Sequence, residues 1–101
     1  SMGMARDTAA NDRQKALAYV GFMRLYTMEQ KDRWLDRVRA RFFDALQCQE
    51  DLPDAYFYMG IAYKKANRPL EAEKAFKKVL EINNGLVLES DNELKSLSSS
   101  R

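Results

Sequence analysis

Few side chains in this sequence could act as catalysts or metal ligands. The chain has one cysteine, Cys48, and no histidine, so the thiol has neither a base to activate it nor a second soft ligand with which to share a metal. Glu71 and Glu73 lie two residues apart on an expected helix, where their carboxylates would point to different sides. The four glycines do not cluster into a phosphate-binding loop. The sequence therefore predicts a protein that is not an enzyme and has no catalytic residue, metal or cofactor.

Basic side chains form a row at Arg33, Arg37 and Arg41, spaced four residues apart on one face of an expected helix. Such a row could bind phosphates or an acidic partner, but we interpret it as a solvated outer face that is partly paired with Glu29 and Asp36. The same interpretation applies to two further basic groups, Lys64, Lys65 and Arg68, and Lys74, Lys77 and Lys78. Because 17 basic and 15 acidic residues leave a net charge of only +2, nucleic-acid binding is the weakest functional alternative.

Length and composition predict one folded domain. The chain has 101 residues, of which 46% are hydrophobic and 32% charged, as in an ordinary small globular protein. No apolar run approaches the roughly 18 residues of a membrane span, and a single cysteine suits a reducing compartment, so we expect a cytoplasmic protein without membrane insertion. Ser1, Met2 and Gly3 resemble the remnant of a purification tag. We expect a flexible segment over 1–10, a single domain over 11–97 and a frayed tail over 98–101.

Helical periodicity dominates the first half of the chain. A first helix is expected from about Asp12 to Leu25. Thr27, followed three residues later by Gln30, has the spacing of a capping box, which predicts that a second helix starts there. The apolar residues of this second helix recur on one side, at Trp34, Val38, Phe42, Ala45 and Leu46. Two antiparallel helices should therefore bury these faces against each other.

The second half of the chain predicts another helical hairpin. Pro53 is suited to the first turn of a helix that ends near Ala66, and the segment from Asn67 to Pro69 forms a tight turn into the next helix. That helix should stop at Asn83, Asn84 and Gly85. Ser90 and Glu93 repeat the capping-box spacing ahead of Leu94 and Leu97, which indicates a short capping helix.

The two hairpins share a pattern. Val38, Phe42, Ala45 and Leu46 are followed after 34 residues (76 − 42 = 34) by Ala72, Phe76, Val79 and Leu80. Leu17, Val20 and Gly21 correspond to Tyr56, Met59 and Gly60 at a spacing of 39 (60 − 21 = 39), so the first hairpin carries five extra residues (39 − 34 = 5) around 25–32. This shared pattern predicts equivalent surroundings for Phe42 and Phe76.

The pattern resembles that of the tetratricopeptide repeat family, which has an aromatic, Leu-Gly and Tyr on the first helix and Ala, Phe and a terminal Pro on the second. The required spacings are met by Tyr56, Met59, Gly60, Tyr63, Ala72 and Phe76, and Asn84 replaces the proline. The match is clear over about 53–86 and partial over 12–52, where Arg24 replaces Tyr. The resemblance implies an all-α fold of antiparallel helical hairpins, about four helices plus a short cap, stacked as a right-handed superhelix. It also implies a protein–protein interaction role as an adaptor or scaffold.

In this family the first helix of each hairpin lines a concave groove. The candidate partner-binding residues are Ala18, Tyr19, Phe22, Phe57, Tyr58, Ile61, Lys64 and Lys65. One subset of the family grips the carboxylate of chaperone tails with Lys and Asn, but those residue types are missing at the corresponding sites, so we reject that function. An apolar groove favours an amphipathic helix or a hydrophobic extended segment held by aromatic anchors. The alternative is that a helix of the same molecule covers Phe57, Tyr58 and Ile61.

Two repeats are fewer than a helical array usually needs, because each repeat exposes an apolar face that its neighbour must cover. Three solutions are open. The segment from Ser90 to Leu97 docks as a cap, the natural chain supplies further repeats, or two copies stack as a homo-oligomer. Structural self-assembly is therefore the main alternative to partner binding.

Overall fold

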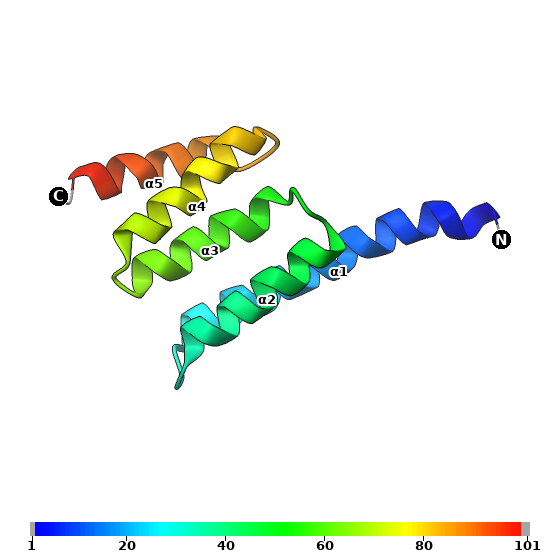
Figure 1. Ribbon diagram of the computed structural model, residues 1–101, viewed down its shortest axis with the longest axis horizontal. Helices are drawn as coiled ribbons and strands as arrows, with labels where there is room; N and C mark the ends of the chain where they lie inside the picture. The colour runs from blue at the N-terminus through cyan, green and yellow to red at the C-terminus, as the bar shows by residue number, and fades with distance from the viewer. Residues whose placement is uncertain (1, 100–101) are drawn as a thin grey trace.

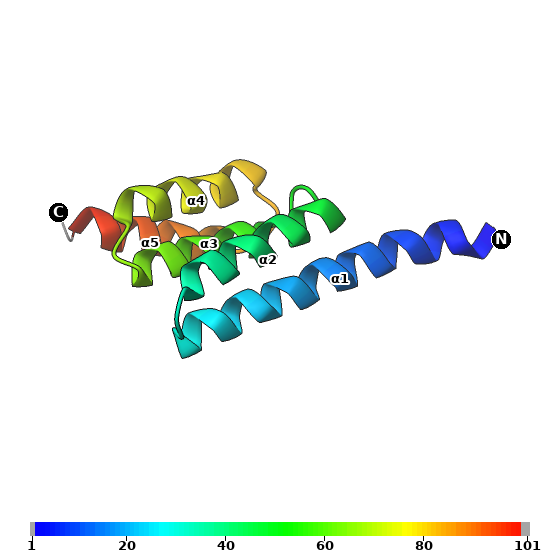
Figure 2. The same cartoon turned by 60° about the horizontal axis from the view of Figure 1, so that its bottom comes forward.

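The structure is a computed structural model that describes the backbone of residues 2–99 and the side chains of residues 11–99. Over residues 2–99 it contains five helices and no strand: α1 (Met2–Glu29), α2 (Trp34–Cys48), α3 (Pro53–Lys65), α4 (Pro69–Ile82) and α5 (Val87–Ser99). The helices α1 and α2 form one antiparallel hairpin, α3 and α4 form a second, and α5 packs along α4 (Figures 1 and 2). This arrangement confirms the predicted all-α repeat architecture.

The first helix is longer at both ends than its sequence pattern predicts. It begins at Met2 instead of Asp12, and Thr27 lies in its last turns instead of opening the second helix. The Thr27 hydroxyl donates to the carbonyl oxygen of Met23 at 2.8 Å, and its side chain is buried. A hydroxyl that bonds back to the preceding turn leaves the helix intact. The predicted capping box at Thr27 and Gln30 is therefore wrong, and the extra residues of the first hairpin extend α1.

The connection from α1 to α2 is a tight turn. Gln30 and Arg33 both have left-handed backbone conformations, with φ of 48° and 59°. The chain reverses between them, and α2 then begins at Trp34.

The second hairpin follows the local signals in its sequence. Pro53 stands in the first turn of α3 and Pro69 in the first turn of α4, where a missing N–H removes no helical hydrogen bond. Asn67 takes the left-handed conformation at the turn, and the Arg68 amide donates to the carbonyl oxygen of Tyr63 at 2.9 Å. Asn83 ends α4 in the same conformation. These bounds confirm the predicted helix–turn–helix.

The predicted capping helix exists, but it starts earlier than expected. The helix α5 begins at Val87, and the backbone amide of Ser90 donates to the carbonyl oxygen of Leu86 at 2.9 Å. Ser90 is fully buried inside this helix, so the predicted capping box at Ser90 and Glu93 is wrong. Ser98 and Ser99 are helical instead of frayed, and residues 100 and 101 of the predicted tail lie outside the described residues.

The core has two apolar clusters that meet at α3. The first joins α1, α2 and α3 and contains Ala16, Val20, Met23, Val38, Ala45, Leu52, Ala55, Met59 and Ala62. The second joins α3, α4 and α5 and contains Phe57, Ala72, Phe76, Val79 and Leu97. Because α3 contributes to both clusters, its remaining faces determine which side chains the fold can offer to a partner.

The two hairpins differ in how their helices meet. Phe76 is fully buried against Gly60, where an added Cβ would lie 2.7 Å from the ring. Nothing lies within 4 Å of a Cβ added at Gly21, because α1 buries Val20 and Met23 instead. Phe42 is half-buried and packs edge-on against Tyr56 of the next hairpin, with ring centroids 5.3 Å apart. The prediction of equivalent surroundings for Phe42 and Phe76 is therefore wrong.

Candidate functional site

A cavity lies where the end of α1 passes α3. Tyr58, Ile61 and Lys65 project from one face of α3 because they are separated by three and four residues, about one helical turn. Together with Arg24, Thr27 and Met28 of α1, these side chains line a cavity of about 140 Å³. The Arg24 guanidinium carbon lies 4.8 Å from the centroid of the Tyr58 ring, a cation–π geometry that orients both side chains. We name this surface the α1–α3 pocket.

Phe57 does not line the α1–α3 pocket. It is only 9% exposed and belongs to the second core cluster, where its ring packs edge-on against Phe76 at 5.7 Å. Leu97 of α5 lies in the same cluster. The alternative in which a helix of the same molecule provides cover therefore holds for Phe57, because α5 packs over this face.

The other candidate residues are dispersed. Lys64 Nζ forms an ion pair with Glu93 of α5 at 2.6 Å. Ala18 is exposed on α1, and Phe22 is 47% exposed and stacks on Tyr26, with ring centroids 6.3 Å apart. Tyr19 is half-buried, and the Arg41 guanidinium carbon lies 5.7 Å from its ring centroid. Ala18, Tyr19 and Phe22 belong to the outer surface and flanks of α1 and Lys64 belongs to α3, and none of the four lines the α1–α3 pocket.

Thr27 and Met28 were missed because the sequence pattern placed the end of the first helix at Leu25. Arg24 lies within that expected helix and was considered only as the residue that replaces a tyrosine of the repeat pattern. A signal for the longer helix exists in the sequence. The small or apolar residues Ala16, Val20 and Met23 are followed by Thr27 in steps of four, three and four residues, which is the period of one continuous helix, and the structure buries all four. Following that stripe to Thr27 would have placed Met28 on the same helix.

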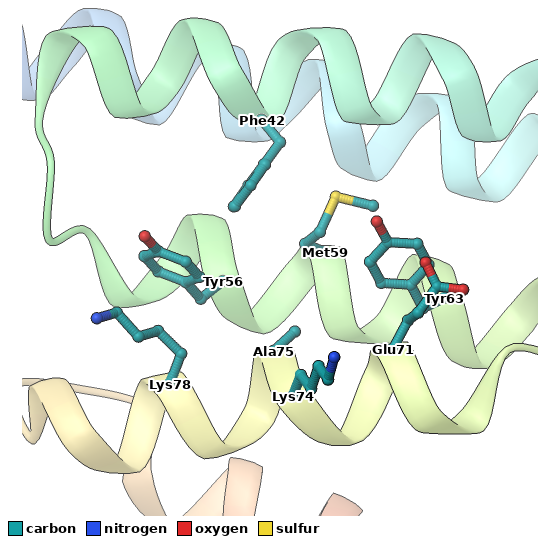
Figure 3. Close-up of a pocket in the computed structure, with 8 residues that line it drawn as sticks. All are labelled: Phe42, Tyr56, Met59, Tyr63, Glu71, Lys74, Ala75 and Lys78. Carbon is teal, nitrogen blue, oxygen red and sulfur yellow. The ribbon is translucent and has the colours of Figure 1, made fainter.

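A larger cavity opens on the opposite face of α3, between α2 and α4 (Figure 3). Its volume is about 400 Å³. Tyr56, Met59 and Tyr63 of α3 form the floor, and Phe42 points in from α2. The α4 side is formed by Glu71, Lys74, Ala75 and Lys78. We name this surface the α2–α4 trough.

Charges in the α2–α4 trough lie on α4 alone. Lys78 Nζ lies 3.6 Å from a Glu81 carboxylate oxygen and 5.9 Å from the centroid of the Tyr56 ring. Glu71 is paired with Arg68 at 3.4 Å. Lys74 has no ion pair within the part of the chain whose side chains are described. The trough therefore presents one uncompensated positive charge beside aromatic rings.

The arginine row of α2 is partly neutralised, as predicted. Arg33 pairs with Asp36 at 3.5 Å and Arg41 with Asp44 at 3.0 Å, whereas the expected partner Glu29 pairs with Lys31. Such exposed pairs contribute little to stability.

Within the described residues, no cluster of His, Cys, Asp and Glu could hold a metal ion. No helix there has the length and apolar character needed to cross a membrane.

Comparison with known proteins identifies the second hairpin. Residues 53–85 match the model of the Tetratricopeptide repeat family, and the matched segment comprises α3, α4 and the turn between them. No curated protein and no solved structure matches the chain. Tetratricopeptide repeats mediate protein–protein interactions, and proteins of this family are typically non-enzymatic scaffolds. The spacing of Tyr56, Gly60, Tyr63, Ala72 and Phe76, the burial of Phe76 against Gly60 and the family match agree, and they identify residues 53–85 as a tetratricopeptide repeat.

Proposed function

We propose that this protein is an adaptor or scaffold module that holds a segment of a partner protein in the α1–α3 pocket. The observation that carries the proposal is the pairing of Tyr58 and Ile61, both half-buried, with Met28, which is 80% exposed. Most of the Met28 side chain is exposed to solvent beside the Tyr58 ring, so an apolar ligand that covers it would remove apolar surface from water. The functional unit is the single domain over 11–97, and we place it in the cytoplasm, where a free thiol such as Cys48 remains reduced.

The chemistry of the pocket defines the partner segment. Tyr58, Ile61 and Met28 favour one or two apolar anchors, and Arg24 and Lys65 at the edge favour carboxylates or carbonyl oxygens beside them. An amphipathic helix or a hydrophobic extended segment with acidic flanks satisfies both requirements.

Replacing Met28 by glutamate is expected to weaken partner capture at least tenfold, because it puts a carboxylate where the apolar anchor would lie. Tyr58→Ala should have a similar effect. Partner recovery from native cell extract, quantified by mass spectrometry, measures both changes. Circular dichroism should show unchanged helicity for Met28→Glu, whose side chain is mostly exposed.

Leu88→Ala is the matched control, because Leu88 is exposed on α5 and outside the pocket. It should capture the same partner as the wild-type protein. Equal capture by Met28→Glu, Tyr58→Ala and the wild-type protein would remove the α1–α3 pocket from the function.

Self-assembly is the second candidate function, and the outward face of α1 supports it. Leu17, Phe22 and Leu25 are 38%, 47% and 44% exposed, although a helix on the surface of a monomer usually turns polar residues outward. Ala18 and Gly21 lie between them, and small residues allow two helices to approach closely.

An antiparallel pair of α1 helices fits the charges on this face. Lys15 and Glu29 each lie seven residues from Phe22 (22 − 15 = 29 − 22 = 7), so a two-fold axis at Phe22 sets Lys15 of one copy opposite Glu29 of the other at both ends. Light scattering over a concentration series should then show a mass that rises towards twice that of the chain. Phe22→Glu should restore the monomer, and a wild-type protein that stays monomeric throughout would eliminate this function.

A further inference from the structure

We infer that the α2–α4 trough is a second binding site, for an acidic amphipathic peptide segment of a partner protein. It lies on the face of α3 that carries Tyr56, Met59 and Tyr63, whereas the α1–α3 pocket lies on the face that carries Tyr58 and Ile61. At 100° per residue these two sets point to opposite sides of the helix. The two sites therefore share no lining residue and are independent.

The shape of the trough suits a peptide. In Figure 1, α2 and α4 lie on either side of α3, and in Figure 3 Phe42 projects from α2 towards the space above Tyr56. The volume of about 400 Å³ falls within the range of roughly 300–1,000 Å³ that is typical of ligand pockets. Phe42 is half-buried where its counterpart Phe76 is fully buried, so a ligand would bury the remainder of its ring.

The free hydrogen-bonding groups of the trough can all donate, and the Lys74 ammonium can only donate. Within the side chains that the structure describes, the hydroxyls of Tyr56 and Tyr63 make no hydrogen bond, and the Lys74 ammonium has no ion pair. The single carboxylate in the lining, that of Glu71, is already paired with Arg68. A ligand that neutralises Lys74 must supply an acceptor, preferably a carboxylate, next to an apolar group that covers the exposed part of Phe42.

These features favour an acidic peptide over a nucleic acid. Stacking of bases needs open aromatic faces, but Phe42 packs edge-on against Tyr56, at an interplanar angle of 80°, and Lys78 lies over that Tyr56 ring. Glu71 and Glu81 flank Lys74 and Lys78 on α4, so the wall lacks the continuous positive charge that tracks a phosphate backbone. One or two peptide carboxylates need only the isolated charge of Lys74.

The test uses the full chain and a fluorescent synthetic peptide in which glutamate alternates with leucine and phenylalanine. Lys74→Ala is expected to weaken binding about tenfold, as loss of a charge-assisted contact does. Lys77→Ala is the matched control, because it removes the same charge from the same helix, on the side facing Leu94 of α5. It should change affinity less than about twofold, which is the size of a screened surface effect. Tyr63→Phe, which removes only a hydroxyl, should weaken binding about threefold to tenfold.

The peptide should bind Tyr58→Ala as tightly as the wild-type protein, which separates this site from the α1–α3 pocket. The inference is overturned if the peptide shows no saturable binding, if Lys74→Ala and Lys77→Ala lose affinity equally, or if Tyr58→Ala alone abolishes binding. It is also overturned if a single-stranded oligonucleotide replaces the peptide at the trough, with affinity that depends on Lys74 and falls steeply with salt.

Discussion

Replacing Phe76 by alanine is expected to lower the free energy of unfolding by about 3–5 kcal/mol. Phe76 is fully buried, and it contacts both Gly60 of α3 and the ring of Phe57, so its loss leaves a cavity at the centre of the second hairpin. A domain of this size is stable by only about 5–15 kcal/mol. The variant should therefore be close to unfolded at 37 °C, and urea denaturation followed by circular dichroism measures the loss.

Phe42→Ala is the matched comparison, because Phe42 occupies the corresponding position 34 residues earlier (76 − 42 = 34). It is half-buried and packs on Tyr56 across the gap between hairpins, so its loss should cost only about 1–2 kcal/mol. Equal losses for the two variants would show that both phenylalanines have equivalent surroundings, which would contradict the structure of the first hairpin.

Replacing Gly60 by alanine is expected to destabilise the protein by about 1–3 kcal/mol, whereas Gly21→Ala should stabilise it by about 0.5–1 kcal/mol. A Cβ at Gly60 would lie 2.7–2.9 Å from three carbons of the Phe76 ring, and that ring has no free space into which to move because it is fully buried. At Gly21 nothing lies within 4 Å of an added Cβ, so only the higher helix propensity of alanine remains.

Thermal unfolding of the two glycine variants measures this difference as opposite shifts of Tm. Gly60→Ala should lower Tm and Gly21→Ala should raise it by a few degrees. A Gly60→Ala protein at least as stable as the wild type would show that α3 and α4 do not approach closely at this point. Destabilisation by Gly21→Ala would show that α1 packs on Gly21, as the shared pattern of the two hairpins predicts.

The second hairpin was predictable from sequence because its boundaries depend on local chemistry. Pro53, Pro69, Asn67 and Asn83 fix or permit particular φ angles whatever surrounds them, and the helices begin and end at or next to these residues. The first hairpin has no comparable signal. Thr27 suits either a helix start or a helix interior, and its burial in the folded protein decides between the two. That burial is a tertiary effect, which the local spacing of Thr27 and Gln30 does not contain.

The candidate site was predictable where it depends on the helical period of one element. Tyr58, Ile61 and Lys65 share a face of α3 in any packing of that helix. Phe57 is adjacent in sequence, but it is buried because α5 brings Leu97 against this side of the second hairpin. Its burial depends on a helix about 40 residues away (97 − 57 = 40), which a family pattern of two helices does not describe.

The α2–α4 trough could not be predicted, because it results from a difference between the two hairpins. The shared pattern predicts that Phe42 fills its own hairpin, as Phe76 does. The longer α1 instead packs through Val20 and Met23, which leaves Gly21 in solvent and Phe42 facing Tyr56 of the next repeat.

Site-specific photo-cross-linking would detect a partner segment that lies against Tyr58 and Ile61 in the α1–α3 pocket. A benzophenone side chain is introduced at Ile61 and, in a separate protein, at the exposed Leu88 of α5. We expect the captured partner to cross-link through position 61 and not through position 88. Capture of the same partner without a cross-link at position 61, or with an equal yield at position 88, would contradict it.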